Sequence, residues 1–303
     1  MKKIKLQKSD LYMLAVILIW ALNLSIVKLA LREISPIPYN GIRLLCASLV
    51  LVIWLVKTEK DIKIKKEHIL KIVLLGISGY TVYQYLFIEG LSLSTASNTA
   101  VLFGMSPIMI SLFSIFFKHE RIKPIAWIGI LLGFTGVYLT ISSKSGGLHF
   151  DMAHLKGDLL IFIAVLLWAH YSVSARPLLK YYSPLKFTAY TMTIGSILFF
   201  PVSVYDIIKL DYSAISWSSW LYLVLSGTIG LSVALIIWFY SVKVVGSSQT
   251  AVYANFQPIF SVISAWLILS ESLPASLLLG TVIITTGVIF THMGREIISD
   301  PSK

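Results

Sequence analysis

Charged residues are scarce in this sequence of 303 residues. Asp, Glu, Lys and Arg together make up 13% of the chain, and the acidic residues number only 14. Soluble domains contain about 25% charged residues, so the composition excludes an ordinary soluble globular fold. The chain is instead 57% hydrophobic, with a mean hydropathy of +0.83. Such a composition is typical of a protein that crosses a membrane several times.

Cysteine and clustered catalytic residues are also nearly absent. The single cysteine, Cys46, lies inside an apolar run, so it cannot form an intrachain disulfide and has no metal-ligand neighbours. The sequence has no paired His/Asp motif, which an intramembrane enzyme would need for acid–base or metal chemistry. We therefore expect a protein that is not an enzyme and that has no cofactor and no metal site.

The excess of basic residues carries information about orientation. The formal net charge is +11, but the basic residues occur in short runs between apolar segments, which argues against nucleic acid as a partner and indicates membrane topology. With a cytoplasmic amino terminus, 19 Lys and Arg residues fall on cytoplasmic segments and five on outside segments. We expect a multi-pass protein of the plasma membrane (cell inner membrane) with both termini in the cytoplasm and the lipid bilayer as its surroundings.

Apolar runs near the 20 residues that cross a bilayer recur along the whole chain. Their links are mostly short, so neighbouring spans are expected to run antiparallel. The first run is too long for the core of a signal peptide and lacks a clear cleavage site, so we interpret it as an uncleaved span. The sequence predicts an all-α polytopic membrane protein with ten transmembrane helices, at Leu11–Leu31, Pro38–Val56, Ile69–Ile88, Ala96–Phe117, Pro124–Ile141, Gly157–Pro177, Pro184–Val204, Ser218–Tyr240, Ser247–Leu269 and Ala275–His292.

The sequence contains an internal repeat. Residues 97–120 match residues 248–271, at a separation of 151, at seven of 24 positions. Weaker matches extend the repeat, for example Trp20 with Trp168 at a separation of 148. A self-match at a fixed separation is the signature of a repeat architecture. We divide the chain into two five-helix repeats, 1–144 and 145–303. Because five is odd, the second repeat enters the membrane from the opposite side, and a site is expected at the midplane between the halves.

Each half has a proline inside a long apolar segment, Pro107 in the first and Pro258 in the second. A proline removes one backbone hydrogen bond and kinks a helix, which a membrane bundle tolerates. Two interrupted helices at corresponding positions are the best sequence pointer to a transporter's binding site. We expect both prolines to act in gating. Simple tolerance of proline in a spanning helix is the alternative.

Together these features resemble the drug/metabolite transporter superfamily, EamA type. The resemblance is carried by the span count, the repeat and the glycine-rich fifth and tenth spans. It also includes Trp20 and Asn23 in the first span, Arg43 in the second, and the proline-containing helices that end at Glu120 and Glu271. It covers almost the whole chain. It implies a secondary active transporter (a permease), commonly an exporter of amino acids or related small amphipathic metabolites, with a cavity between the halves.

The candidate substrate-binding residues are polar, aromatic or adaptable side chains within the spans. Trp20 and Asn23 share one helix face, as do Trp168 and Tyr171. This pairing suits a cavity that orients an amphipathic solute, although interhelical packing is the alternative. The remaining candidates are Tyr80, Gln84, Asn98, Met105, His170, Trp238, Tyr253, Asn255 and Gln257.

Energy coupling is left open by the sequence. We find no Asp or Glu near the expected midplane, where proton-coupled carriers usually have a carboxylate. His170 is the one titratable residue expected there, so coupling uses His170, proceeds by exchange, or is absent. An uncoupled facilitator or channel is the alternative function, although no ring of carboxylates and no carbonyl filter sequence is found.

Several other residues receive structural interpretations. We interpret Arg43 as an anchor near the outer face, and Glu120 and Glu271 as polar stops or salt-bridge partners at helix ends. Gly129 and Gly136 match Gly280 and Gly287 in the other half. Small residues let helices approach closely, so these glycine faces are expected to serve either packing within the molecule or a homodimer.

Overall fold

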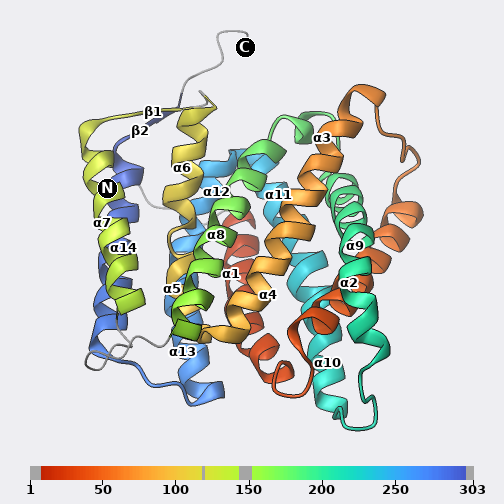
Figure 1. Ribbon diagram of the computed structural model, residues 1–303. Coiled ribbons are helices and arrows are strands. Elements are labelled where there is room, and N and C mark those ends of the chain that lie inside the picture. The colour runs from red at the N-terminus through yellow and green to blue at the C-terminus, as the bar shows by residue number, and fades with distance from the viewer. Residues whose placement is uncertain (1–7, 118–119, 143–151, 298–303) are drawn as a thin grey trace.

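The computed structural model describes residues 8–117, 120–142 and 152–297, and these are almost entirely helical (Figure 1). In these ranges, seven helical segments are long and apolar enough to cross a membrane, and three further apolar helices are shorter. The protein is therefore a multi-pass membrane protein. Its described residues are helical apart from one short pair of antiparallel strands and the connecting turns. The seven are Leu11–Ala30, Pro36–Thr58, Lys66–Leu93, Ala96–Phe116, His154–Lys180, Pro184–Ile208 and Trp217–Val245, and the shorter three are Pro124–Leu139, Ala254–Leu269 and Ala275–Thr291.

Several of the long segments are composed of shorter helices joined end to end. The α-helices are α1 (Lys8–Ala30), α2 (Pro36–Thr58), α3 (Lys66–Gly76), α4 (Tyr83–Leu93), α5 (Ala96–Phe103), α6 (Ser106–Phe116), α7 (Pro124–Ser142), α8 (Met152–Ala175), α9 (Pro184–Ile208), α10 (Trp217–Leu225), α11 (Ala234–Val245), α12 (Ser247–Tyr253), α13 (Gln257–Leu269) and α14 (Ala275–Met293). Two π-helices, η1 (Ile77–Val82) and η3 (Ser226–Val233), and two 3₁₀ turns, η2 (Leu178–Lys180) and η4 (Ala254–Phe256), complete them. The strands β1 (Glu120–Ile122) and β2 (Arg295–Ile297) pair antiparallel, with Arg121 opposite Glu296.

Hydroxyl side chains begin several of these helices. The side-chain oxygens of Thr95, Ser183 and Ser216 accept hydrogen bonds from backbone N–H groups three residues further on, in α5, α9 and α10. Proline occupies the first turn of α2 and of α9. Both features favour the start of a helix. The N–H groups of the first turn have no partner within the helix, so a side-chain oxygen can accept a hydrogen bond from one of them. A proline in the first turn lacks an N–H group that would have had no partner there.

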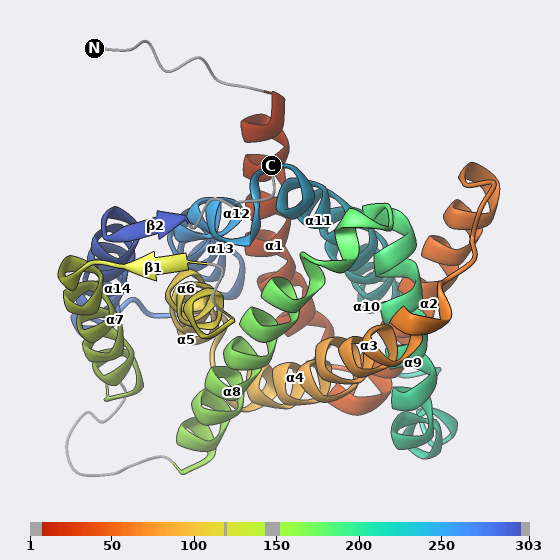
Figure 2. The same cartoon turned by 90° about the horizontal axis from the view of Figure 1, so that it is seen from above.

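The bundle has two flanks and a centre (Figure 2). α7 packs along α14 on one flank and α2 along α9 on the other, while α1 packs on α13 and α8 packs on α4 between them. A Cβ atom at Gly129 would lie 2.4 Å from the carbonyl oxygen of Gly287, and one at Gly136 would lie 2.9 Å from that of Gly280. The glycine faces therefore pack α7 against α14 inside the molecule, which is the first of the two roles expected of them.

The contact between α2 and α9 joins residues at corresponding places in the repeat. The hydroxyl oxygens of Ser48 and Ser196 lie 2.6 Å apart, and the two residues are separated by 148 positions. This is the same separation that relates Trp20 to Trp168. A buried hydroxyl in a bilayer needs a partner of this kind.

The segments Lys66–Leu93 and Trp217–Val245 each contain a π-helix that the sequence does not predict. η1 follows Gly76 and contains Gly79, and η3 contains the glycines 151 positions later, Gly227 and Gly230. A Cβ atom at Gly79 would lie 2.7 Å from the ring of Tyr171 in α8. The glycines thus allow side chains of neighbouring helices to approach the widened turns. π-helical turns inside α-helices are frequent at functional sites.

The two proline-containing spans are broken rather than kinked. Two residues separate the end of α5 at Phe103 from the start of α6 at Ser106, and Pro107 lies in the first turn of α6. Likewise η4 separates α12 from α13, and Pro258 lies in the first turn of α13. The sequence predicts two interrupted helices, and the interruptions lie just before the two prolines. The physical reason is that a proline fits the start of a helix, where its missing N–H costs no hydrogen bond.

Candidate functional site

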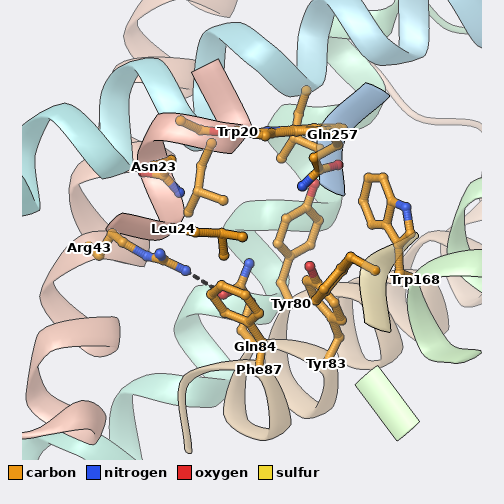
Figure 3. Close-up of a pocket in the computed structure, with 14 residues that line it drawn as sticks. Trp20, Asn23, Leu24, Arg43, Tyr80, Tyr83, Gln84, Phe87, Trp168 and Gln257 are labelled. Carbon is orange, nitrogen blue, oxygen red and sulfur yellow. Dashed lines mark hydrogen bonds between the residues drawn. The ribbon is translucent and has the colours of Figure 1, made fainter. Parts of the chain in front are cut away.

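A cavity lies at the centre of the bundle, where both broken spans and both π-helical spans meet α1 and α8 (Figure 3). It contains about 600 Å³ of space that protein atoms do not fill, part of which is open to solvent. The lining residues are Trp20, Asn23, Leu24, Arg43, Tyr80, Tyr83, Gln84, Phe87, Phe103, Trp168, Gly230, Leu231, Leu235 and Gln257.

One wall of the cavity is aromatic. The rings of Trp20 and Trp168 meet edge to face, with centroids 5.6 Å apart, and the ring of Tyr83 lies 5.9 Å from that of Trp168. Trp238 is fully buried behind them, 5.2 Å from Trp20 and 5.5 Å from Trp168. The indole nitrogen of Trp20 donates to the carbonyl oxygen of Gly230, at 2.9 Å. This bond fixes the Trp20 ring against the π-helical turn η3.

The opposite side of the cavity is polar. Arg43 donates from Nη2 to Oε1 of Gln84, at 2.5 Å, and from Nη1 to the hydroxyl of Ser226, at 3.2 Å. Asn40 donates to the backbone carbonyl of Gln84, at 3.3 Å, which ties α2 to α4. Figure 3 shows the Arg43 side chain and the Trp168 indole on opposite sides of the space. The cavity thus presents a cation and amides to one end of a solute and flat apolar rings to the other.

A pair of tyrosines supports the wall on the α4 side. The hydroxyl of Tyr171 donates to that of Tyr80, at 3.1 Å, and lies 2.9 Å from the Thr191 hydroxyl. Tyr80 lines the cavity, whereas Tyr171 is fully buried behind it. Tyr171 and Asn23 occupy matching places in the repeat, and each lies against a glycine of a π-helix. Tyr171 therefore positions the wall and does not form its surface.

The structure brings six of the predicted site residues to the cavity, and two more directly behind its walls. Their role in binding stays a prediction. The six are Trp20, Asn23, Tyr80, Gln84, Trp168 and Gln257, and the two are Tyr171 and Trp238.

Asn98 belongs to a second polar cluster, at the corner between α4 and α5. Asp158, only 2% exposed near the start of α8, accepts hydrogen bonds from Ser94 and, at 3.1 Å, from Asn98. Lys28 donates to three backbone carbonyls of the same corner, including that of Ser94. The carboxylate of Glu271 accepts the first two N–H groups of α5, both at 2.9 Å. We call these five residues the corner cluster.

The corner cluster refines two sequence interpretations. Glu271 was expected to be a polar stop or a salt-bridge partner. Its carboxylate instead caps α5, which connects the second half of the chain to the first. Asp158 was not among the predicted site residues, yet it is a buried carboxylate with side-chain donors from the first half. A carboxylate at a helix amino terminus is favourable because the N–H groups there carry partial positive charge.

The remaining predicted residues lie away from the cavity lining. Met105 is buried in the turn between α5 and α6. His170 is half-buried beside Phe113, with ring centroids 5.8 Å apart. Tyr253 and Asn255 lie where α12 meets η4.

Sequence reasoning missed eight of the residues that line the cavity, and four of these carry an aromatic ring or a charge. Tyr83 and Phe87 share a face of α4, but an aromatic stripe looks the same in a packed core, and Phe103 has no distinguishing signal at all. Arg43 was interpreted as an anchor near the outer face. The structure instead has it 1% exposed and on the cavity wall. A lone charge inside a span was the signal that could have identified it.

No metal centre competes with this interpretation in the part of the chain that the structure describes, because no group of three or more His, Cys, Asp or Glu residues is arranged to hold an ion.

Comparisons with known proteins agree with the membrane architecture. The sequence profile of the EamA-like transporter family matches residues 7–142 and 155–293. The chain is similar to the uncharacterized transporter YoaV of Bacillus subtilis (strain 168), with 22% identity over 96% of this chain and 99% of that protein. It is also similar to an uncharacterized transporter of Archaeoglobus fulgidus, with 27% identity over 94% of this chain and 97% of that protein. A solved crystal structure superposes with a TM-score of 0.70 at 18% identity, covering 95% of this chain and 99% of that one, which speaks for the fold alone.

Proposed function

Because this protein belongs to the EamA-like transporter family, we propose that it is a secondary active transporter that exports amino acids or related small amphipathic metabolites by alternating access. The observation that carries the proposal is the central cavity, whose aromatic wall contains Trp20 and Trp168, two residues in contact that are 148 positions apart in the sequence repeat. A transporter of this design binds its solute near the midplane, between the repeats.

We further propose ten spans in two inverted repeats, 1–144 and 145–303. Four observations support this architecture. Helices at matching positions pack against each other in the pairs α2–α9 and α7–α14. The third and eighth spans both contain a π-helix, and the fourth and ninth are both broken before a proline. The family profile matches the chain in two segments of similar length.

Alternating access requires a closure on each side of the cavity, and polar contacts lie toward both ends of the bundle. At one end is the corner cluster. At the other end the link between α2 and α3 is tied to the start of α9, where Lys186 donates to the carbonyl of Asp61, at 2.8 Å. Nearby, Nδ1 of His68 lies 2.8 Å from the hydroxyl of Tyr182. We propose that these two sets of contacts break in turn, with the broken helices at Pro107 and Pro258 as the moving parts.

The same proposal includes the orientation and the location of the protein. Both termini lie in the cytoplasm, and the membrane is the plasma membrane (cell inner membrane). The corner cluster then faces the outside, and the His68 side faces the cytoplasm. The excess of basic residues on one set of segments supports this assignment.

The test begins with metabolite profiling of cells that overproduce the protein, to find solutes that accumulate outside. Each candidate is then measured in proteoliposomes for saturable uptake and for counterflow, in which unlabelled solute inside accelerates the entry of labelled solute. A carrier shows both. Flux that rises linearly with concentration and shows no counterflow would establish the alternative, a channel or uncoupled facilitator. No flux for any candidate would refute the transport function.

A further inference from the structure

Arg43 is a buried cation without a buried anion beside it. Its side chain lines the central cavity at 1% exposure. Its hydrogen-bond acceptors, Oε1 of Gln84 and the hydroxyl of Ser226, are neutral groups. Its Nε atom is buried and has no hydrogen-bond partner. No Asp or Glu is among the residues that line the cavity, and no ion pair of Arg43 is found in the described ranges of the chain.

A buried guanidinium without an anion is energetically unfavourable unless a bound group supplies the negative charge. A charge taken out of water loses its hydration, and a buried cation is normally paired with a carboxylate. The rings of Tyr39 and Phe87 each lie 5.7 Å from the guanidinium carbon. Cation–π contacts offset part of the loss, but they supply no negative charge. The guanidinium is therefore held in place on the wall of a cavity without a negative charge beside it.

The other end of the cavity has a different chemistry. Trp168, Tyr83 and Phe103 present ring surface there. Flat aromatic walls favour an apolar or aromatic body. The amides of Asn23 and Gln257 lie on the lining as well, and they can bond to a neutral or amino substituent without adding charge.

We infer that the central cavity recognises an organic monocarboxylate, with its carboxylate on Arg43 and its apolar or aromatic body against the Trp168 wall. The inference rests on the proposed function and deepens it by naming the class of solute. One guanidinium among the lining residues balances one negative charge. A phosphate dianion would leave a second charge uncompensated in a site of low dielectric. A guanidinium also matches the planar geometry of a carboxylate.

The experiment uses probes that differ in charge and little in shape. Indole-3-acetate and indole-3-acetamide are titrated at pH 7 into the purified full-length protein in lipid nanodiscs, with the dissociation constant measured by calorimetry. Phenyl phosphate and phenylacetate form a second pair, which separates a dianion from a monoanion. The wild-type protein should bind each carboxylate at least about tenfold more tightly than its partner, because charge-assisted hydrogen bonds are about twice as strong as neutral ones.

Three variants assign the preference to Arg43. The Arg43→Gln variant should bind indole-3-acetate and indole-3-acetamide with equal affinity. Arg43→Lys, which keeps the charge but loses the planar fork, should retain part of the preference, and it remains informative if Arg43→Gln does not fold. Lys209→Gln removes a charge from an exposed loop and should leave the preference unchanged.

Each of the following results would overturn the inference. Equal binding of acid and amide by the wild-type protein would do so, as would failure to bind either one, or a full acid preference in both Arg43 variants. Tighter binding of phenyl phosphate than of phenylacetate would exclude a monocarboxylate site. These failures are distinct from failure of the proposed function, because a transporter of neutral solutes would still show saturable counterflow in proteoliposomes.

Discussion

At the scale of single residues, the cavity combines side chains that the sequence could identify with one that it could not. Trp20, Asn23 and Gln84 were identifiable because lipid cannot satisfy their polar groups. Arg43 was visible as a charge inside a span, but its function depends on which helices face it. Sequence spacing determines the neighbours of a residue on its own helix and says nothing of Ser226, which is 183 positions away.

Glu271 provides a test of how the two halves are held together. Glu271→Gln removes the negative charge that accepts the first two N–H groups of α5 and keeps one carbonyl acceptor. The change should destabilise the protein by about 1–2 kcal/mol, since hydrogen bonds to charged groups contribute more than neutral ones. Thermal unfolding in detergent measures this effect. Glu67→Gln, at an exposed position of α3, is the matched control. Equal transition temperatures for both variants would contradict the capping role.

Glu33 makes the stability of the folded protein depend on pH. Its carboxylate accepts hydrogen bonds from the hydroxyl and the backbone N–H of Ser216, at the start of α10. These bonds lower the pKa of Glu33 below its ordinary value. The ionised form therefore favours the folded state. This contribution is present above the pKa of the unfolded chain and is lost as the pH falls through the lowered pKa.

The corresponding measurement is the transition temperature of the wild-type protein and of Glu33→Gln between pH 7 and pH 3. The variant should be slightly less stable at neutral pH, and the difference should shrink as the pH falls. The effect is small because Glu33 is exposed and solvent screens its interactions. A difference that stays constant across this range would mean that Glu33 stabilises α10 without its charge.

At the scale of elements, the sequence predicted where the helices lie better than how they are built. Long apolar runs and proline positions located the spans, because the bilayer sets their length. The prolines indicated that the helices around Pro107 and Pro258 are interrupted, but the π-helices η1 and η3 were not predictable. A π-turn shifts one hydrogen bond along the chain and leaves no mark on composition. The glycines at 76, 79, 227 and 230 were the available signal, but glycine is also common in ordinary membrane helices.

A matched pair of substitutions can distinguish the contributions of the two π-helices to stability and to transport. A Cβ atom at Gly79 would lie 2.7 Å from the ring of Tyr171, which two hydroxyl contacts hold in place. A Cβ atom at Gly230 would lie 2.6 Å from Oδ1 of Asn23, the end of a shorter side chain at the cavity. Gly79→Ala should therefore cost about 1–3 kcal/mol of stability, as overpacking does, and Gly230→Ala should cost less.

Transport should rank these two variants in the opposite way. Gly230→Ala pushes Asn23 toward the cavity and should slow solute flux while the protein stays folded. Thermal unfolding and counterflow, measured on the same two preparations, provide both rankings. If Gly230→Ala transports at the wild-type rate, the η3 turn has no part in shaping the cavity.

The prolines are the elements that the proposed mechanism requires to move. Pro107→Ala and Pro258→Ala restore an N–H donor near the start of α6 and of α13, which favours extending these helices back through the breaks. Each variant should remain folded and inserted but turn over more slowly, and the double variant more slowly still. Counterflow rates give the comparison, and Pro201→Ala, at a proline inside α9 away from the cavity lining, is the control. Wild-type rates in all variants would assign the gate to another element.

At the scale of the whole molecule, the internal repeat was the most informative feature of the sequence. A separation of 148 to 151 residues marked Trp20 and Trp168 as equivalent positions, and the structure has their rings in contact. The separation anticipated neither the contact between Ser48 and Ser196 nor the capping of α5 by Glu271. A repeat predicts which positions are equivalent, but the packing between equivalent helices depends on side chains from both halves at once.

The most direct test of the central claim is the accessibility of the cavity from the two sides of the membrane. A cysteine is placed at Asn23 in a background where the single native cysteine is changed, Cys46→Ser, and the protein is reconstituted in proteoliposomes. A membrane-impermeant thiol reagent is then applied from each side. Alternating access predicts that the cysteine reacts from either side and that a transported solute slows both reactions. Reaction from one side only, or rates that the solute leaves unchanged, would contradict the account.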